Sequence, residues 1–139
     1  MIHEEICTYE VAKLAKEKGF PQHIGDDAYI VENEYDDEYE VGCHYPIQFI
    51  PDYLPTITAP TQSLLQRWLR EEKGIVIDVV LDWQYNIEAE EIRYQYRIGS
   101  KRRMTIGDVQ TRGIVCDRHF DTYELALEDA ELYVLKNLL

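Results

Sequence analysis

Basic residues are scarce in this chain. Its 139 residues hold 14 Lys and Arg against 27 Asp and Glu, a formal net charge of −13 at pH 7. A general nucleic-acid binder of this size is usually basic, because its affinity comes largely from neutralising phosphates. The charge balance therefore argues against direct binding to nucleic acid.

Cysteine is also rare, and the three that are present, Cys7, Cys43 and Cys116, are odd in number and far apart. This pattern argues against a disulfide framework and predicts a reducing, cytoplasmic setting. No apolar run reaches the roughly 18 residues that indicate a transmembrane helix. The acidic N-terminus lacks the apolar segment of a secretory signal, so we expect no association with a membrane.

Several catalytic signatures are missing. The two serines, Ser63 and Ser100, do not lie in the strand-to-helix turn that exposes a hydrolase nucleophile. The glycine-bounded segment 107–113 lacks the lysine and the following helix of a phosphate-binding loop. Two carboxylates could perform acid–base chemistry, but nothing in the sequence selects a pair. We predict no catalytic residue and no cofactor.

The sequence also predicts no metal site. The acidic run 26–40 holds eight carboxylates, but it lacks the spacing of a calcium-binding loop. Zinc could in principle use Cys43 and His44 together with Cys116 and His119. Alternation along a strand sends Cys43 and His44 to opposite faces, so we expect buried cysteines and surface histidines instead.

The clearest structural signals lie near the centre of the chain. Thr58 is the better of two candidate N-caps, with Ala59, for a helix whose first turn contains Pro60. An apolar stripe follows at 64–69, and Gly74 is expected to end the helix in the left-handed conformation. Ile75–Leu81 then reads as a strand with one fully apolar face.

Periodicity and capping signals predict the remaining elements. They are a helix from Thr8 to Gly19, a hairpin of Ala28–Val31 with Tyr39–Tyr45, a strand at Glu91–Ile98 that pairs with Ile75–Leu81 through a turn near Asn86, short strands at Met104–Ile106 and Gly113–Cys116, and a final helix capped by Asp121 or Thr122. Four prolines make residues 46–60 an extended connector without a central strand or a helix. The broad apolar face of the final helix predicts deep packing or a partner.

Together these elements predict an α+β fold with a single domain spanning residues 1–139. We expect a mostly antiparallel sheet of about 4–6 strands with three helices packed on it, in the order α-β-β-α-β-β-β-α.

Charged residues gather at a few places that could bind a partner. Arg93 and Arg97 alternate with Tyr94 and Tyr96, so we expect the tyrosines in the core and the arginines paired with the chain's own carboxylates. Two candidate interaction sites remain, an acidic hairpin and a basic turn. Their residues are Glu34, Asp36, Asp37 and Glu38, and Lys101, Arg102 and Arg103.

Three segments of the chain, in this order, carry a resemblance to known sequences. They are Thr8–Phe20; Ala59–Gln62 with Gln66, Trp68–Glu71 and Gly74–Ile75; and Thr122–Glu124 with Ala126–Glu128. The chain resembles a group of small uncharacterised proteins from Bacteroides-type gut bacteria and their phages or integrated elements. The resemblance extends from the first helix to the last, and its central motif is the most specific part. It implies a cytoplasmic protein of mobile-element origin and carries over no activity, cofactor or catalytic residue.

The function that these observations favour is that of a non-enzymatic accessory protein with a protein partner. The alternative is an acidic mimic of nucleic acid, directed against host defence or DNA-binding proteins, because arrayed carboxylates can occupy a basic cleft. A small hydrolase or metal-dependent enzyme ranks third. Homodimer formation stays open.

Overall fold

The computed structural model describes residues 4–22, 28–31, 40–42, 56–82, 92–100, 104–106, 109–111 and 113–139. The helices in these ranges are α1 (Tyr9–Glu17), α2 (Gln62–Glu72) and α4 (Tyr123–Asn137). The strands are β1 (Ala28–Val31), β2 (Glu40–Gly42), β3 (Thr56–Ala59), β4 (Ile75–Leu81), β5 (Tyr94–Ser100), β6 (Met104–Ile106), β7 (Val109–Thr111) and β8 (Ile114–Val115). The mixed α+β class is confirmed.

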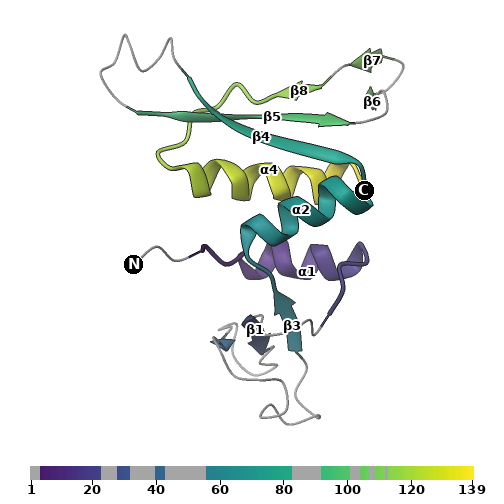
Figure 1. Cartoon of the computed structure of the whole chain (residues 1–139), viewed down its shortest axis with the longest axis vertical. Coiled ribbons are helices and arrows are strands. Elements are labelled where there is room, and N and C mark those ends of the chain that lie inside the picture. Colours follow the sequence, from purple (N-terminus) through teal and green to yellow (C-terminus); the bar gives the residue numbers. More distant parts are fainter. Residues whose placement is uncertain are drawn as a thin grey trace.

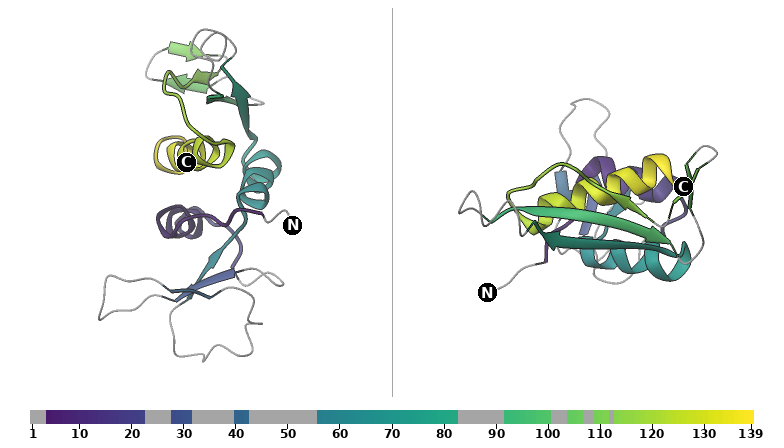
Figure 2. Two further views of the ribbon diagram at one scale, coloured as in Figure 1. Left: turned by 90° about the vertical axis from the view of Figure 1, so that its left-hand side faces the viewer. Right: turned by 90° about the horizontal axis from the view of Figure 1, so that it is seen from above.

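The described strands do not form the single sheet that the sequence predicted. They divide into β2-β1-β3, β4-β5-β8 and the pair β6-β7, all antiparallel. Figures 1 and 2 show the layers along the long axis: β4-β5-β8 at one end, then α4 and α2, then α1, and β1 with β3 at the other end. Because helices separate the two three-stranded sheets, each sheet packs on helices instead of on a further strand. Two strands, β3 and β7, were not predicted.

The two long strands pair as predicted. In the β4–β5 hairpin, Ile77 lies opposite Ile98, and both side chains are buried against the helices. Tyr96 is buried on the same face, which confirms its predicted place in the core, whereas Arg97 points the other way and is exposed. The main core joins all three helices to this sheet: Val11, Ala15, Leu65, Leu69, Ile75, Ile77, Tyr96, Ile98, Leu127, Ala130, Val134 and Leu135.

The start of α2 differs from its prediction. Thr58 cannot cap the helix, because it lies within β3 and pairs with Tyr29 of β1. The N-cap is Thr61, whose hydroxyl accepts a hydrogen bond from the N–H of Leu64 at 3.3 Å. A strand fits between two prolines here because β3 is at the edge of its sheet, where a proline interrupts no ladder.

The other helix ends largely follow the capping signals. Gly74 and Gly19 adopt φ angles of 69° and 94°, the left-handed conformation that ends a helix at little cost when the residue is glycine. Of the two candidate caps for α4, Thr122 is the one used, and its hydroxyl accepts from the N–H of Leu125 at 3.1 Å. Thr8 occupies the N-cap position of α1 without making a capping bond. Its hydroxyl instead bonds to α4, as described below.

The broad apolar face of α4 is mostly covered within the chain. Leu127, Val134 and Leu135 are buried in the core between α1, α2 and the sheet. Leu125, at 54% exposure, lies on the flank of the helix. The middle of the stripe is therefore packed within the chain, as one of the two predictions had it, while Tyr123 at the start of α4 is 40% exposed.

The outer edge of β4 is partly blocked. Asp82 donates its N–H to the carbonyl of Arg93. Because hydrogen-bonded pairs alternate along an antiparallel ladder, the carbonyl of Ile77 must point away from β5. The side chain of Gln66 on α2 donates to that carbonyl at 2.9 Å. An incoming strand would have to displace Gln66 to pair along this edge.

Candidate functional site

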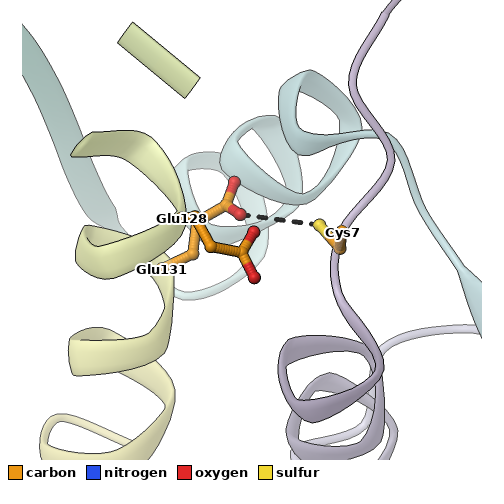
Figure 3. A group of neighbouring side chains, drawn as sticks. All are labelled: Cys7, Glu128 and Glu131. Carbon is orange, nitrogen blue, oxygen red and sulfur yellow. Dashed lines mark hydrogen bonds between the residues drawn. The ribbon is translucent and has the colours of Figure 1, made fainter. Parts of the chain in front are cut away.

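A buried junction between the start of the chain and α4 carries the most unusual chemistry of the described residues. Cys7 precedes α1, and Glu128 and Glu131 share one face of α4 because they are three residues apart. The thiol of Cys7 donates to Oε2 of Glu131 at 3.5 Å. One ligand atom from each residue lies within 4.8 Å of the others. Figure 3 shows the carboxylates extending from α4 toward Cys7. We call these three residues the junction cluster.

Backbone hydrogen bonds fix the position of Cys7. The segment before α1 runs antiparallel to the residues that lead into α2, with Ile6 opposite Thr61. The N–H of Cys7 donates to the carbonyl of Pro60 at 2.9 Å, and the N–H of Gln62 donates to the carbonyl of Glu5 at 2.9 Å. Residues 5–7 and 60–62 therefore pair as a short antiparallel ladder, and this pairing holds the Cys7 thiol in place.

Glu131 is a carboxyl group in an apolar setting. Its side chain is 0% exposed, and its Oε1 atom has no hydrogen-bond partner. The pKa of Glu131 is raised to about 9, chiefly by burial and then by the nearby charge of Glu128, and the hydrogen bond from Cys7 partly offsets the rise. Burial, followed by the same two carboxylates, also raises the pKa of the Cys7 thiol. Both shifts favour the protonated forms, and a protonated thiol is a poor nucleophile.

Glu128 connects the junction to the surface. Its Oε1 accepts a hydrogen bond from the hydroxyl of Thr8, and its Oε2 accepts from the side chain of Gln62 at 3.2 Å. Beside it lies a surface pocket of about 330 Å³. The lining residues are Glu5, Ile6, Thr8, Gln62, Thr122, Glu124, Leu125 and Glu128. Since this lining contains three carboxylates and no basic residue, the pocket favours cations over anions.

A second feature lies on the far side of the β4-β5-β8 sheet, the face that the described helices leave uncovered (Figure 1). Val76 and Val115 are exposed there, at 37% and 66%. Gly99 lies opposite Val76 in the β4–β5 register and has no side chain to fill the space between. The result is an open groove of about 450 Å³ lined by Val76, Asp78, Arg97, Ile98, Gly99, Gly113, Ile114 and Val115. We call it the sheet groove.

The arginines flanking the tyrosine strand do not form one basic site. Arg93 makes an ion pair with Asp121, as predicted for an arginine on this strand. Arg97 lies at the rim of the sheet groove, opposite Asp78 in the strand register. Tyr96 donates its hydroxyl proton to Asp129 at 2.8 Å, and its pKa is raised, first by burial and then by that bond.

The two interaction sites chosen from the sequence lie outside the described residues. They are the acidic hairpin Glu34, Asp36, Asp37 and Glu38, and the basic turn Lys101, Arg102 and Arg103. The strands on either side of the acidic residues, β1 and β2, do pair as a hairpin. Both sites stay predictions.

The zinc arrangement that the sequence argued against is described only in half, since Cys43 and His44 are outside the described ranges. Cys116 is buried, as expected, and its sulfur accepts from the N–H of Arg118 at 3.4 Å. His119 pairs with Asp82 instead of turning toward Cys116. Within the described part of the chain, the residues grouped closely enough to hold a metal ion are Cys7, Glu128 and Glu131.

The junction cluster was missed from the sequence. One signal was available: Glu131 falls between Leu127 and Val134 on the apolar stripe of the last helix, where a carboxylate is unusual. Nothing local connects that glutamate to Cys7, which is 124 residues away.

Protein-family models, curated proteins and solved structures give no match to this chain. None of the helices in the described ranges has the length and apolar character needed to cross a membrane. The junction cluster and the sheet groove are therefore the two features that bear on function.

Proposed function

We propose that the chain is a non-enzymatic accessory protein that binds another protein through the sheet groove. The observation that carries the proposal is a sheet face that the described helices leave uncovered, where two exposed valines lie beside the hollow at Gly99. Exposed apolar surface with a polar rim is typical of protein-binding sites. A cytoplasmic, mobile-element origin is part of the same proposal and is supported by the sequence resemblance alone.

The groove has the chemistry to hold an apolar side chain from a partner. Val76 and Val115 supply apolar walls, and the exposed backbone at Gly99 lets a partner side chain approach closely. Asp78 and Arg97 place both signs of charge at the rim, so a partner can be oriented without a strong net attraction. The face suits a partner better than the strand edge does, because Gln66 occupies the edge at Ile77.

Filling the groove gives a direct test. A Cβ atom added at Gly99 would meet no atom within 4 Å, so Gly99→Val plugs the groove without a clash and suits a strand. Partners captured from a lysate of a Bacteroides-type host by the tagged chain should be lost with Gly99→Val and with Val115→Ser. Circular dichroism and thermal unfolding should show that both variants remain folded.

Ile92→Ser is the matched control, because Ile92 is as exposed as Val115, at 67%, and does not line the groove. A partner retained by the control and lost by both groove variants supports the proposal. A partner that all three variants retain would place binding elsewhere on the chain.

The acidic nucleic-acid mimic remains the alternative, supported by the net charge of −13. It predicts capture of basic DNA-binding proteins that weakens as salt rises. Neutralising Glu34, Asp36, Asp37 and Glu38 to amides should then abolish capture, while Gly99→Val should leave it unchanged. Salt-independent capture would exclude the mimic.

A further inference from the structure

We propose that the junction cluster is a binding site for a divalent metal ion of the zinc class, with Cys7, Glu128 and Glu131 as its protein ligands. The proposal does not depend on the sheet groove. It rests on the convergence of one sulfur and two carboxylates from two elements, with ligand atoms within 4.8 Å of one another. Figure 3 shows this convergence between α4 and the segment before α1.

The first independent support is the unpartnered oxygen of Glu131. A buried polar atom without a hydrogen bond costs free energy, and such atoms are rare in folded proteins. Glu131 has one, at Oε1, on a side chain with 0% exposure. A cation that binds Glu131 through both carboxylate oxygens would give Oε1 the partner that it lacks among the described residues.

The second support is the combination of ligand types. Zinc accepts thiolate and carboxylate ligands and is commonly held by three protein groups plus water. Calcium needs six to eight oxygen atoms and magnesium an octahedral oxygen shell, which one sulfur and two carboxylates do not supply. Thiolate ligands favour zinc and similar metals over both.

Access and orientation also fit. Glu128 borders the acidic pocket of about 330 Å³, so an ion and its water ligand can enter from that side. The Thr8 hydroxyl and the Gln62 amide hold Glu128 in place, as hydrogen bonds around metal ligands commonly do. Cys7 Sγ and Glu131 Oε2 already lie 3.5 Å apart, which is about the separation of two ligand atoms around a tetrahedral zinc. Rotation of the Glu128 side chain can bring its oxygen closer from within 4.8 Å.

The experiment uses the whole chain, freed of metal by a chelator and kept reduced with a phosphine. Cobalt(II) is the first probe, because a thiolate ligand gives it a near-ultraviolet charge-transfer absorption that carboxylates do not give. We expect one cobalt(II) per chain and its displacement by zinc(II). Absence of the thiolate absorption would overturn the proposal.

Three variants, each with one cysteine replaced by serine, locate the site. Cys7→Ser should lose the thiolate absorption, whereas Cys43→Ser and Cys116→Ser, the matched controls, should keep it. Glu131→Gln should bind at least about tenfold more weakly. It should still fold, because a neutral amide replaces a neutral acid of the same shape. An absorption that survives Cys7→Ser and disappears in a control would assign the metal to another cysteine and refute this site.

Discussion

The junction cluster and the sheet groove reverse the usual distribution of side chains in opposite ways. At the junction, Glu131 is fully buried among helices, while on the sheet Val115 is 66% exposed. Charged residues are seldom fully buried unless paired, and an exposed apolar patch is as informative as a buried polar group. Neither arrangement is needed for packing, because an apolar residue at 131 and a polar residue at 115 would serve the fold better. The comparison is the reason for proposing a binding role for each region.

The largest expected effect concerns the junction and pH. In the metal-free chain, the pKa of Glu131 is about 9 when the chain is folded, against its ordinary value of 4.5. Between these values the folded state holds a proton that the unfolded state has lost, so the free energy of unfolding falls as pH rises, by up to about 1.4 kcal/mol per pH unit. Urea unfolding with chelator present, at pH 5, 6, 7 and 8, measures this slope.

Glu131→Gln is the control for that slope, since an amide does not titrate. The variant should lack the decrease and should be more stable than the parent chain at pH 8. With saturating zinc(II), the free energy of unfolding of the parent chain should instead rise with pH, because ionised ligands bind the metal more tightly at higher pH. If the parent chain and Glu131→Gln, both measured with chelator, showed the same dependence of unfolding free energy on pH, Glu131 would ionise normally. The contrast with the sheet groove would then fail.

The next effect separates the core from the groove. Leu69→Ala removes a fully buried side chain and should lower the free energy of unfolding by about 3 kcal/mol, from lost burial and a new cavity. Val76→Ala, on the exposed side of β4, should change it by less than about 0.5 kcal/mol. Denaturant unfolding of the two variants checks the difference. Similar losses would show that Val76 is covered and that the sheet groove is not open.

The smallest effect compares two threonines at helix N-caps. Thr122 caps α4 with its hydroxyl, whereas the hydroxyl of Thr8 bonds to Glu128. Thr122→Ala should cost about 1 kcal/mol and change the cobalt(II) affinity less than Thr8→Ala does, because Thr122 lines the pocket without bonding to a ligand residue. Thr8→Ala should weaken cobalt(II) binding by roughly tenfold. Parallel unfolding and cobalt(II) titrations distinguish the two roles, and equal effects on cobalt(II) affinity would contradict them.

Local signals predicted much of the fold. Gly74 ends α2 as expected because only glycine adopts the left-handed conformation at little cost. The alternation in Ile75–Leu81 and Glu91–Ile98 predicted the β4–β5 pairing, because a strand's period sets which side chains share a face. These features depend on residues close in sequence or on a short hairpin.

The errors depend on contacts between distant residues. Thr58 has the chemistry of an N-cap, but pairing with β1 draws it into a strand, and Thr61 takes over the cap. One sheet was predicted where the described strands form several, because periodicity does not say where helices intervene. The junction cluster was not predictable, since no local rule joins Cys7 to a glutamate 124 positions later.

The packing of α1 against α4 also has a consequence for synthesis. The ribosome makes α1 early, yet the helix that covers it, and the carboxyl groups that meet Cys7, come near the end of the 139 residues. The early part of the nascent chain must therefore wait with apolar surface exposed, where chaperones and proteases recognise it. A chain cut short before Glu131 would lack Val134 and Leu135 of the main core. The core can therefore form completely only after translation has passed that point.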